Sequence, residues 1–260
     1  MRRFLSSLFL ILALLPGPAF ADGLGVVLIH GKQGGPDVPH LAYLSQQIEK
    51  AGFMLDKPTM CWSRSRIYDH SLPDCMADID ASLARLKNRG ATSFVIVGHS
   101  LGGFGAILYG STHDGLKGII ALAPAPSPRA ATRPEIQASL QRAQQLIASG
   151  HGNDPLTFDD TNTGPRGIVT IQVNATPNNF LSFYDMSGAA NLVANTGNLK
   201  APILWISGTR DPSQLAREAG FDRAPPNPLN RYLQINAGHI DTPDAAADAV
   251  VAWLKEIAKN

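Results

Sequence analysis

The stretch that decides the fold runs Ser93-Phe-Val-Ile-Val-Gly-His-Ser-Leu-Gly-Gly-Phe-Gly105. Its first five residues carry no charge and are rich in β-branched and aromatic side chains, which is typical of a central strand of a parallel sheet. Ser100 follows at once within the pattern G-x-S-x-G, and a glycine-rich helix start comes next. The stretch therefore predicts a strand, a tight turn and a helix, with a candidate nucleophile at the turn. The alternative is a serine that only caps the helix.

Short apolar runs alternate with amphipathic stretches along the rest of the chain. This alternation indicates a parallel sheet with helices on both faces. Runs typical of strands cover residues 25–29, 53–55, 93–97, 116–122, 201–207 and 231–235. Apolar residues at helical spacing predict helices over about 38–50, from Asp74 as N-cap to Gly90, from Ser100 through Tyr109, over about 134–149 and from about Thr242.

Two more polar residues follow predicted strands, in Gly208-Thr209-Arg210-Asp211 and in Gly238-His239. The carboxyl ends of parallel strands meet at one edge of a sheet, so Ser100, Asp211 and His239 are expected to lie together there. A serine hydroxyl needs a base, and the base needs a group to orient it. We therefore expect Ser100 as nucleophile, His239 as base and Asp211 as the carboxylate that holds the base. Asp211 precedes Pro212, so a plain turn is its alternative.

An attack on a carbonyl carbon also needs two N–H donors for the oxyanion. The backbone of Leu101, directly after the nucleophile, is one expected donor. The other is expected from the loop after the first strand, at Lys32, with Gln33 as the second choice. The Lys32 ammonium is expected to be solvated, and His30 is expected to support this turn.

Composition excludes several other functions. The chain has 260 residues, 44% of them hydrophobic and 17% charged, and a formal net charge of +1. This length suits one globular domain, and scattered Lys and Arg residues do not predict a nucleic-acid partner. Metal-ligand spacings such as H-E-x-x-H are absent from the sequence, so neither a metal nor a cofactor is expected. The acidic pair Asp159-Asp160 is expected in a solvated turn.

The first 21 residues are typical of a signal peptide. Arg2 and Arg3 precede an apolar run over residues 4–15, and Ala19-Phe20-Ala21 has the small–x–small cleavage pattern. We expect cleavage after Ala21, a mature domain over residues 22–260, no stable membrane anchor, and a periplasmic or secreted protein. An uncleaved anchor is the alternative. Because such a compartment is oxidising, Cys61 and Cys75 are predicted to form a disulfide rather than remain two buried thiols.

A long insertion interrupts the alternation at about residues 125–200. Insertions of this length in a compact domain are usually functional, so it is interpreted as a cap over the site, with a surface ornament as the alternative. Its one convincing helix is followed by a short β-like piece at Ile168 to Val173. The candidate pocket-lining residues are Phe104 and, in the insertion, Phe180, Phe183 and Tyr184, which are equally explained as core.

Taken together, His30-Gly31, Gly98-His99-Ser100-Leu101-Gly102-Gly103, Gly208-Thr209-Arg210-Asp211 and Gly238-His239 resemble the α/β-hydrolase superfamily, in order, over nearly the whole mature chain. That resemblance implies an eight-stranded template. The chain lacks room before Gly25 for the first two strands, so a mostly parallel six-stranded sheet is expected.

The superfamily includes esterases, lipases, thioesterases, peptidases and cofactor-free haloperoxidases, and the fold does not choose among them. The expected function is hydrolysis of a small-molecule or lipid-like carboxylic ester through an acyl-enzyme on Ser100. A thioesterase or a peptidase with the same three residues is one alternative. A non-catalytic homologue that binds a ligand is the other.

Overall fold

The computed structural model describes residues 23–125, 131–164 and 166–260. The predicted signal peptide lies outside the described residues. Six strands form one sheet in the order β2-β1-β3-β4-β7-β8, and each neighbouring pair is parallel. This confirms the predicted six-stranded α/β fold. The strands are β1 (Leu24–Ile29), β2 (Met54–Asp56), β3 (Ser93–His99), β4 (Gly118–Leu122), β7 (Ile203–Gly208) and β8 (Arg231–Ile235).

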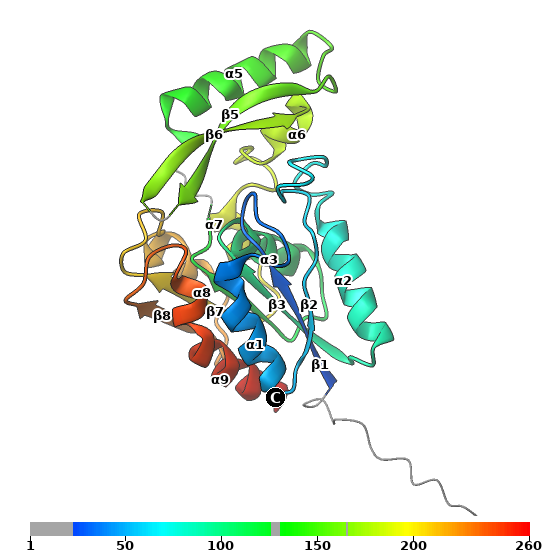
Figure 1. The fold of residues 1–260 in the computed structure, drawn as a ribbon, viewed down its shortest axis with the longest axis vertical. Helices are drawn as coiled ribbons and strands as arrows, with labels where there is room; N and C mark the ends of the chain where they lie inside the picture. Colours follow the sequence, from blue (N-terminus) through cyan, green and yellow to red (C-terminus); the bar gives the residue numbers. More distant parts are fainter. Residues whose placement is uncertain (1–22, 126–130, 165) are drawn as a thin grey trace, which may run out of the picture.

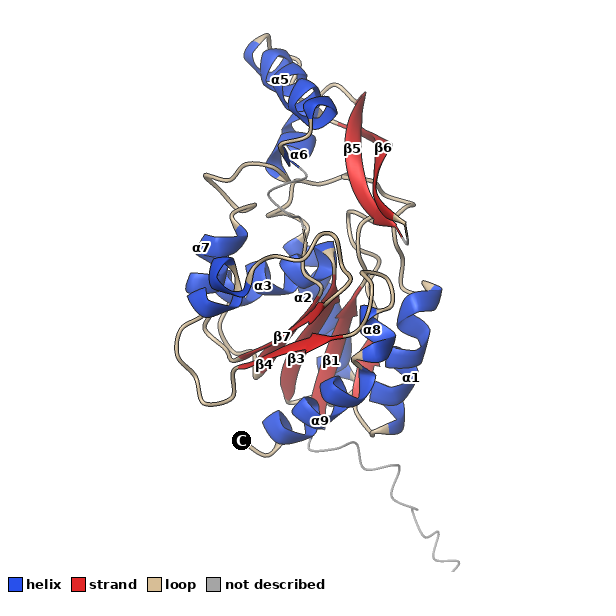
Figure 2. Cartoon of the chain, turned by 90° about the vertical axis from the view of Figure 1, so that its left-hand side faces the viewer, coloured by secondary structure: helices blue, strands red, loops and turns tan. Residues whose placement is uncertain are grey.

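Helices cover both faces of the sheet because its inner strands are apolar on both sides. Successive side chains of a strand point to opposite faces, so Ile96 of β3 joins one buried cluster while Val95 and Val97 join the other. The first cluster lies under α2 (Met76–Asn88) and α3 (Leu101–Thr112), and the second lies under α1 (Ala42–Lys50) and α9 (Ala247–Ala258). Figure 2 shows α1 and α9 on one side of the strands and α3 on the other.

Two helix starts differ from the sequence prediction. Asp74 does not cap α2: the helix begins at Met76, its N-cap is Cys75, and the Asp74 carboxylate accepts a hydrogen bond from the Ser71 hydroxyl. The C-terminal segment forms two helices, α8 (Thr242–Ala245) and α9, separated at Ala246. Among the described residues, η3 (Arg217–Ala219) and η4 (Phe221–Arg223) are short 3-10 helices between β7 and β8, and the 3-10 helix η2 (Pro39–Leu41) leads directly into α1.

The segment between β4 and β7, here called the insertion, carries a small sheet of its own. Its described elements are α5 (Pro134–Ala148), β5 (Leu156–Gly164), β6 (Gly167–Ala175), α6 (Pro177–Ser182) and α7 (Leu192–Gly197). β5 and β6 pair as an antiparallel hairpin. Figure 1 shows this hairpin and α5 at the end of the molecule toward which β1 runs. The β-like piece at Ile168 to Val173 falls within β6, but β5 was not predicted from the sequence.

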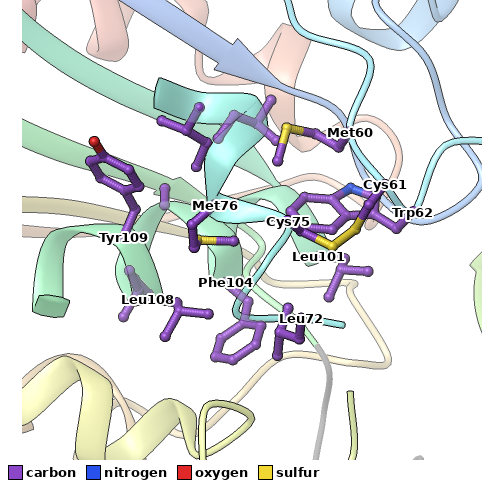
Figure 3. Close-up of a cluster of buried hydrophobic side chains, with 14 of the residues drawn as sticks. Met60, Cys61, Trp62, Leu72, Cys75, Met76, Leu101, Phe104, Leu108 and Tyr109 are labelled. Carbon is purple, nitrogen blue, oxygen red and sulfur yellow. A yellow bond between two sulfur atoms is a disulfide. The ribbon is translucent and has the colours of Figure 1, made fainter. Parts of the chain in front are cut away.

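The predicted disulfide is confirmed. Cys61, in the loop after β2, is bonded to Cys75 at the start of α2. Figure 3 shows it beside the Trp62 and Leu101 side chains in the buried cluster. The Trp62 indole Nε1–H donates to the His30 carbonyl at 3.0 Å. The disulfide-bonded loop is therefore held against the loop that follows β1.

Candidate active site

Ser100 occupies a strained turn between β3 and α3. Its φ of 57° and ψ of −122° lie in a region that few non-glycine residues adopt. Gly98 and Gly102 make the turn possible: a Cβ on Gly98 would collide with the Gly102 carbonyl, and one on Gly102 would lie 2.5 Å from the Ile29 carbonyl oxygen. The turn thus depends on two glycines that allow backbone segments to meet closely.

The structure brings together the three residues predicted from separate strand ends. His239 Nε2 lies 2.9 Å from Ser100 Oγ, and His239 Nδ1 lies 2.7 Å from Asp211 Oδ2. All three residues are buried. The imidazole can therefore receive a proton from the hydroxyl while its other nitrogen donates to the carboxylate.

Ser213 also belongs to this group, although it was not predicted from the sequence. Its hydroxyl donates to Asp211 Oδ1 at 2.6 Å and lies 3.0 Å from His239 Nδ1, and its N–H donates to Asp211 Oδ1 at 2.8 Å. Burial acts to raise the pKa of Asp211, but the hydrogen bonds from His239 and Ser213 outweigh it and lower that pKa. The carboxylate therefore stays ionised beside the imidazole. The spacing Asp-Pro-Ser was a usable signal, because a serine two residues after an aspartate often bonds back to it.

Two further histidines lie next to His239. The rings of His40 and His99 have centroids 5.1 Å apart, and those of His99 and His239 lie 5.0 Å apart. His99 Nε2–H donates to the His239 carbonyl at 2.9 Å. Burial, and after it the neighbouring histidines, lower the pKa of His99 well below its ordinary value, and burial also lowers that of His40. His99 is thus a neutral support for the backbone of His239.

Within the part of the chain that the structure describes, neither predicted oxyanion donor is taken up by another acceptor. Leu101 is the first residue of α3, so its N–H has no acceptor within that helix. Within the described residues, the Lys32 N–H makes no hydrogen bond. Gln33, the second choice, already donates its N–H to the Trp62 carbonyl at 2.9 Å.

His30 supports the loop after β1 through hydrogen bonds to Gly31 and Met60. Its Nδ1 lies 2.8 Å from the Gly31 carbonyl oxygen, and its Nε2 accepts from the Met60 N–H at 3.2 Å.

Two sequence predictions, that the Lys32 ammonium is solvated and that Asp160 lies in a solvated turn, are wrong. The ammonium is not solvated: it donates to Asp160 Oδ1 at 2.8 Å, to Oδ2 at 2.9 Å and to the Thr161 carbonyl at 2.8 Å. Asp160 is not in a solvated turn either, because it is fully buried in β5 and also accepts from the Tyr68 and Tyr184 hydroxyls. Burial and the Asp160 charge raise the pKa of both tyrosines. This buried cluster joins the insertion to the loop after β1.

Ser100 and His239 open onto a cavity of about 260 Å³. Its lining comes from the loops after β1, β2 and β3, the loop before α8, and β5 of the insertion. The lining includes Lys32, His40, Arg64, Ser100, Asn162 and His239.

None of the four predicted pocket residues lines this cavity. Phe104 and Phe180 are fully buried, and Phe180 stacks on Phe158 at 4.5 Å between ring centroids. Phe183 stacks on Tyr68 at 4.0 Å, and Tyr184 bonds to Asp160. Here the structure selects the core interpretation.

The described residues show neither a metal-ligand cluster nor a membrane-spanning helix. They contain no group of three or more His, Cys, Asp or Glu side chains placed to hold a metal ion. Across the same residues, no helix has the length and apolar character needed to cross a membrane.

Solved structures with the same fold cover nearly the whole chain. One, from work on two metagenome-derived lipolytic enzymes, has a TM-score of 0.64 at 18% identity and covers 95% of this chain and 99% of its own. An esterase from Butyrivibrio proteoclasticus with bound ferulic acid has 0.63 at 18%, covering 91% and 90%. The monoacylglycerol lipase of Paleococcus ferrophilus has 0.66 at 21%, covering 91% and 95%. At these identities the likeness establishes the fold alone.

No curated protein matches the chain. A family model described as serine aminopeptidase, S33, matches residues 62–225, which is more than half of it. The matched region includes the turn at Ser100 and the loop at Asp211. The chain therefore belongs to this family of the α/β-hydrolase superfamily.

Proposed function

We propose that this protein is a serine hydrolase that cleaves carboxylic esters through an acyl-enzyme. The observation that carries the proposal is the hydrogen-bonded series from Ser100 through His239 to Asp211, which begins at a cavity large enough for a small ligand. Each member of the series has the partner that nucleophilic catalysis requires.

The proposed reaction has two halves. Ser100 Oγ bonds to the ester carbonyl carbon while its proton passes to His239 Nε2, and the N–H groups of Leu101 and Lys32 bind the oxyanion. The bond to the alcohol oxygen then breaks, and that oxygen takes the proton from His239. In the second half a water gives a proton to His239 and bonds to the acyl carbon. The bond from that carbon to Ser100 Oγ then breaks, and Oγ takes the proton back from His239. Asp211 stays ionised and stabilises the imidazolium in both halves.

The lining of the cavity favours an ester over a peptide with a free amino terminus. An aminopeptidase has to bind the α-ammonium group of its substrate, and a carboxylate beside the scissile bond is the usual partner for such a cation. The residues lining the cavity around Ser100 include no Asp or Glu. The charged lining groups are instead the cations Lys32 and Arg64.

The cavity also favours a small acyl or alcohol group. Ligand pockets commonly have volumes of about 300–1,000 Å³, and this one has about 260 Å³. The large aromatic side chains of the insertion are packed into its own core rather than open to the cavity. We therefore expect turnover to fall as the acyl chain lengthens beyond a few carbons.

A substrate panel tests the proposal. The mature protein is assayed with 4-nitrophenyl esters from acetate to decanoate, beside matched thioesters and aminoacyl amides, and compared with Ser100→Ala and with the exposed control Ser149→Ala. We expect the short esters to be the best substrates, and Ser100→Ala to lower kcat by at least about 10⁴-fold. Preference for thioesters or amides would select one of the alternative enzymes. Tight ligand binding without turnover would select the non-catalytic homologue.

We also propose that the chain is exported and cleaved after Ala21. The charged and apolar pattern of residues 1–21 supports this, and so does the disulfide, since such bonds persist in oxidising compartments. N-terminal sequencing of the protein from the periplasm or the medium is expected to begin at Asp22. A chain that retains Met1 and stays with the membrane would contradict cleavage.

A further inference from the structure

We infer that Arg64 forms an anion subsite beside Ser100, and that the ester substrate carries a free carboxylate. This inference rests on the proposed function and names the substrate class for that site. The observation behind it is the set of charges around the cavity. Its lining residues include two with cationic side chains, Lys32 and Arg64, and none with a carboxylate.

The charge of Lys32 is already neutralised. Its ammonium has three N–H donors, and three acceptors lie within 2.9 Å: both carboxylate oxygens of Asp160 and the Thr161 carbonyl. Asp160 is fully buried behind it. Lys32 therefore has no donor left for a ligand.

The charge of Arg64 is not neutralised. Within the described parts of the chain, its guanidinium makes neither a hydrogen bond nor an ion pair. Arg66, two residues later, shows the contrast: it is bonded to Asp69 and to Asp78, at 2.8 Å in each case. The same loop thus holds one arginine tied by carboxylates and a second whose five donors remain available beside the nucleophile.

The backbone of Arg64 has a fixed place relative to the oxyanion loop. Its N–H donates to the Gly34 carbonyl at 3.1 Å, and the Gln33 N–H donates to the Trp62 carbonyl at 2.9 Å. These two bonds pair the segment 62–64 with the segment that follows Lys32. The Cys61–Cys75 disulfide and the bond from the Trp62 indole to His30 hold the segment from the other side. Arg64 is therefore presented from an anchored loop.

A carboxylate is the anion that fits this arrangement. The planar guanidinium fork matches the two oxygens of a carboxylate with two parallel N–H···O bonds. One unpaired cation balances one negative charge, whereas a phosphate monoester carries close to two at neutral pH. The nearby His40 does not supply the second, since burial lowers its pKa. The subsite thus selects a monoanionic substrate.

Two pairs of esters test the inference on the mature protein. One pair differs in the leaving group, 4-acetoxybenzoate against its methyl ester. The other differs in the acyl group, the 4-nitrophenyl monoester of adipic acid against 4-nitrophenyl hexanoate. We expect the anionic member of at least one pair to have the higher kcat/KM. Arg64→Gln is expected to reduce that preference about threefold to fivefold, mainly through KM, because it removes a charge-assisted bond made by an exposed side chain.

Two control variants and a salt series make the test specific. Arg64→Lys keeps the charge without the fork and is expected to retain part of the preference. Arg142→Gln removes an exposed arginine of the insertion that does not line the cavity, and is expected to leave the preference unchanged. Rising ionic strength is expected to reduce the preference of the wild type, since the pair is exposed to solvent.

The outcomes separate the inference from the function on which it rests. If the wild type cleaves both members of each pair equally well, or if Arg64→Gln keeps the full preference, the subsite is overturned while ester hydrolysis stands. If the wild type cleaves none of the four esters, nor any short neutral ester, the proposed function itself fails. A preference for the phosphate-bearing 4-acetoxyphenyl phosphate over both carboxylates would overturn the choice of anion.

Discussion

Backbone hydrogen bonds hold Ser100 in the turn between β3 and α3. Its N–H donates to the Leu122 carbonyl at 2.9 Å, and its own carbonyl accepts from Phe104 and Ala125 at 3.1 Å. These bonds offset the cost of a positive φ, which for a non-glycine residue is of order 1–3 kcal/mol. The backbone held in this way places the Ser100 hydroxyl 2.9 Å from His239 Nε2.

Ser213 is expected to act as a positioning residue for the proposed base. Ser213→Ala removes the hydroxyl bond to Asp211, which is worth about 0.5–1.5 kcal/mol, so kcat is expected to fall about threefold to tenfold with little change in KM. Steady-state kinetics on a short ester measure both constants, and Ser213→Thr is expected to restore most of the loss. An unchanged kcat in the alanine variant would show that Asp211 is oriented without this hydroxyl.

His99 is expected to make stability fall at mildly acid pH. Above about pH 6.5, the ordinary pKa of a histidine, the ring is neutral in the folded and the unfolded chain. Below it the unfolded chain binds a proton that the folded chain excludes, because the pKa of His99 is lowered in the fold. The unfolding free energy therefore falls as the pH drops below 6.5, by at most about 1.4 kcal/mol per pH unit for one proton.

Urea unfolding between pH 7.5 and pH 5 measures this effect. His99→Gln keeps a donor toward the His239 carbonyl and is expected to flatten the pH dependence. His151→Gln serves as the control, because that ring is 59% exposed and open to water in the folded chain. Equal slopes in the wild type and in His99→Gln would contradict the assignment.

The sequence predicted those site residues whose position follows from the end of a strand. Ser100, Asp211 and His239 each come directly after an apolar run, and parallel strands bring such ends to one edge. Ser213 was signalled instead by the local spacing Asp-Pro-Ser, but Arg64 and Asp160 have no marker. Their roles depend on which loops meet in three dimensions, as when Asp160 reaches Lys32 across 128 positions of sequence.

At the level of elements, β5 connects the insertion to the site. Asp160 and Thr161 on this strand accept from Lys32, and Asn162 and Thr163 line the cavity. The sequence concealed β5 because the apolar alternation stops after Leu156 and Phe158: the next inward position holds the buried Asp160, and Thr161, Asn162 and Thr163 after it are polar. The periodicity of apolar residues could not reveal β5, because its inward residue Asp160 forms an ion pair with Lys32.

Asp160→Asn tests how much the ion pair between Lys32 and Asp160 contributes to the unfolding free energy. The change leaves a largely buried ammonium without its counter-charge, so the unfolding free energy is expected to fall by about 3–5 kcal/mol. The double variant Lys32→Met/Asp160→Asn is expected to lose less than the sum of the two single losses. Lys57→Met breaks the exposed pair with Asp37 and is expected to cost less than about 1 kcal/mol. A cost for Asp160→Asn as small as this control would contradict the account of the cluster.

At the scale of the whole molecule, three loops and the insertion converge at one edge of the sheet. The loop after β1 supplies Lys32, the loop after β2 supplies Arg64, and the turn after β3 supplies Ser100. The disulfide ties the second of these loops to α2, and Trp62 ties it to the first. The mostly parallel six-stranded sheet was predictable from the alternation of apolar runs and helices. The way these loops join was not, because their contacts are polar and specific to this chain.

The disulfide is expected to stabilise the fold through its loop. Cys61 and Cys75 are 14 positions apart, and closing a loop of this length contributes about 3 kcal/mol in the chain-entropy model. The variant Cys61→Ala/Cys75→Ala is expected to lose that amount in urea unfolding. Reductant is expected to destabilise the wild type similarly and to leave the double variant unaffected. Equal stability of wild type and variant would contradict the prediction.

The central claim is that Ser100 is a nucleophile activated by His239 and Asp211. The most direct measurement is stoichiometric labelling of the mature protein with a fluorophosphonate, with the modified residue located by peptide mass spectrometry. The account predicts one label per chain on Ser100, none in Ser100→Ala, and much slower labelling in His239→Ala and Asp211→Asn. Labelling of another residue, or no labelling of the folded wild type, would contradict it.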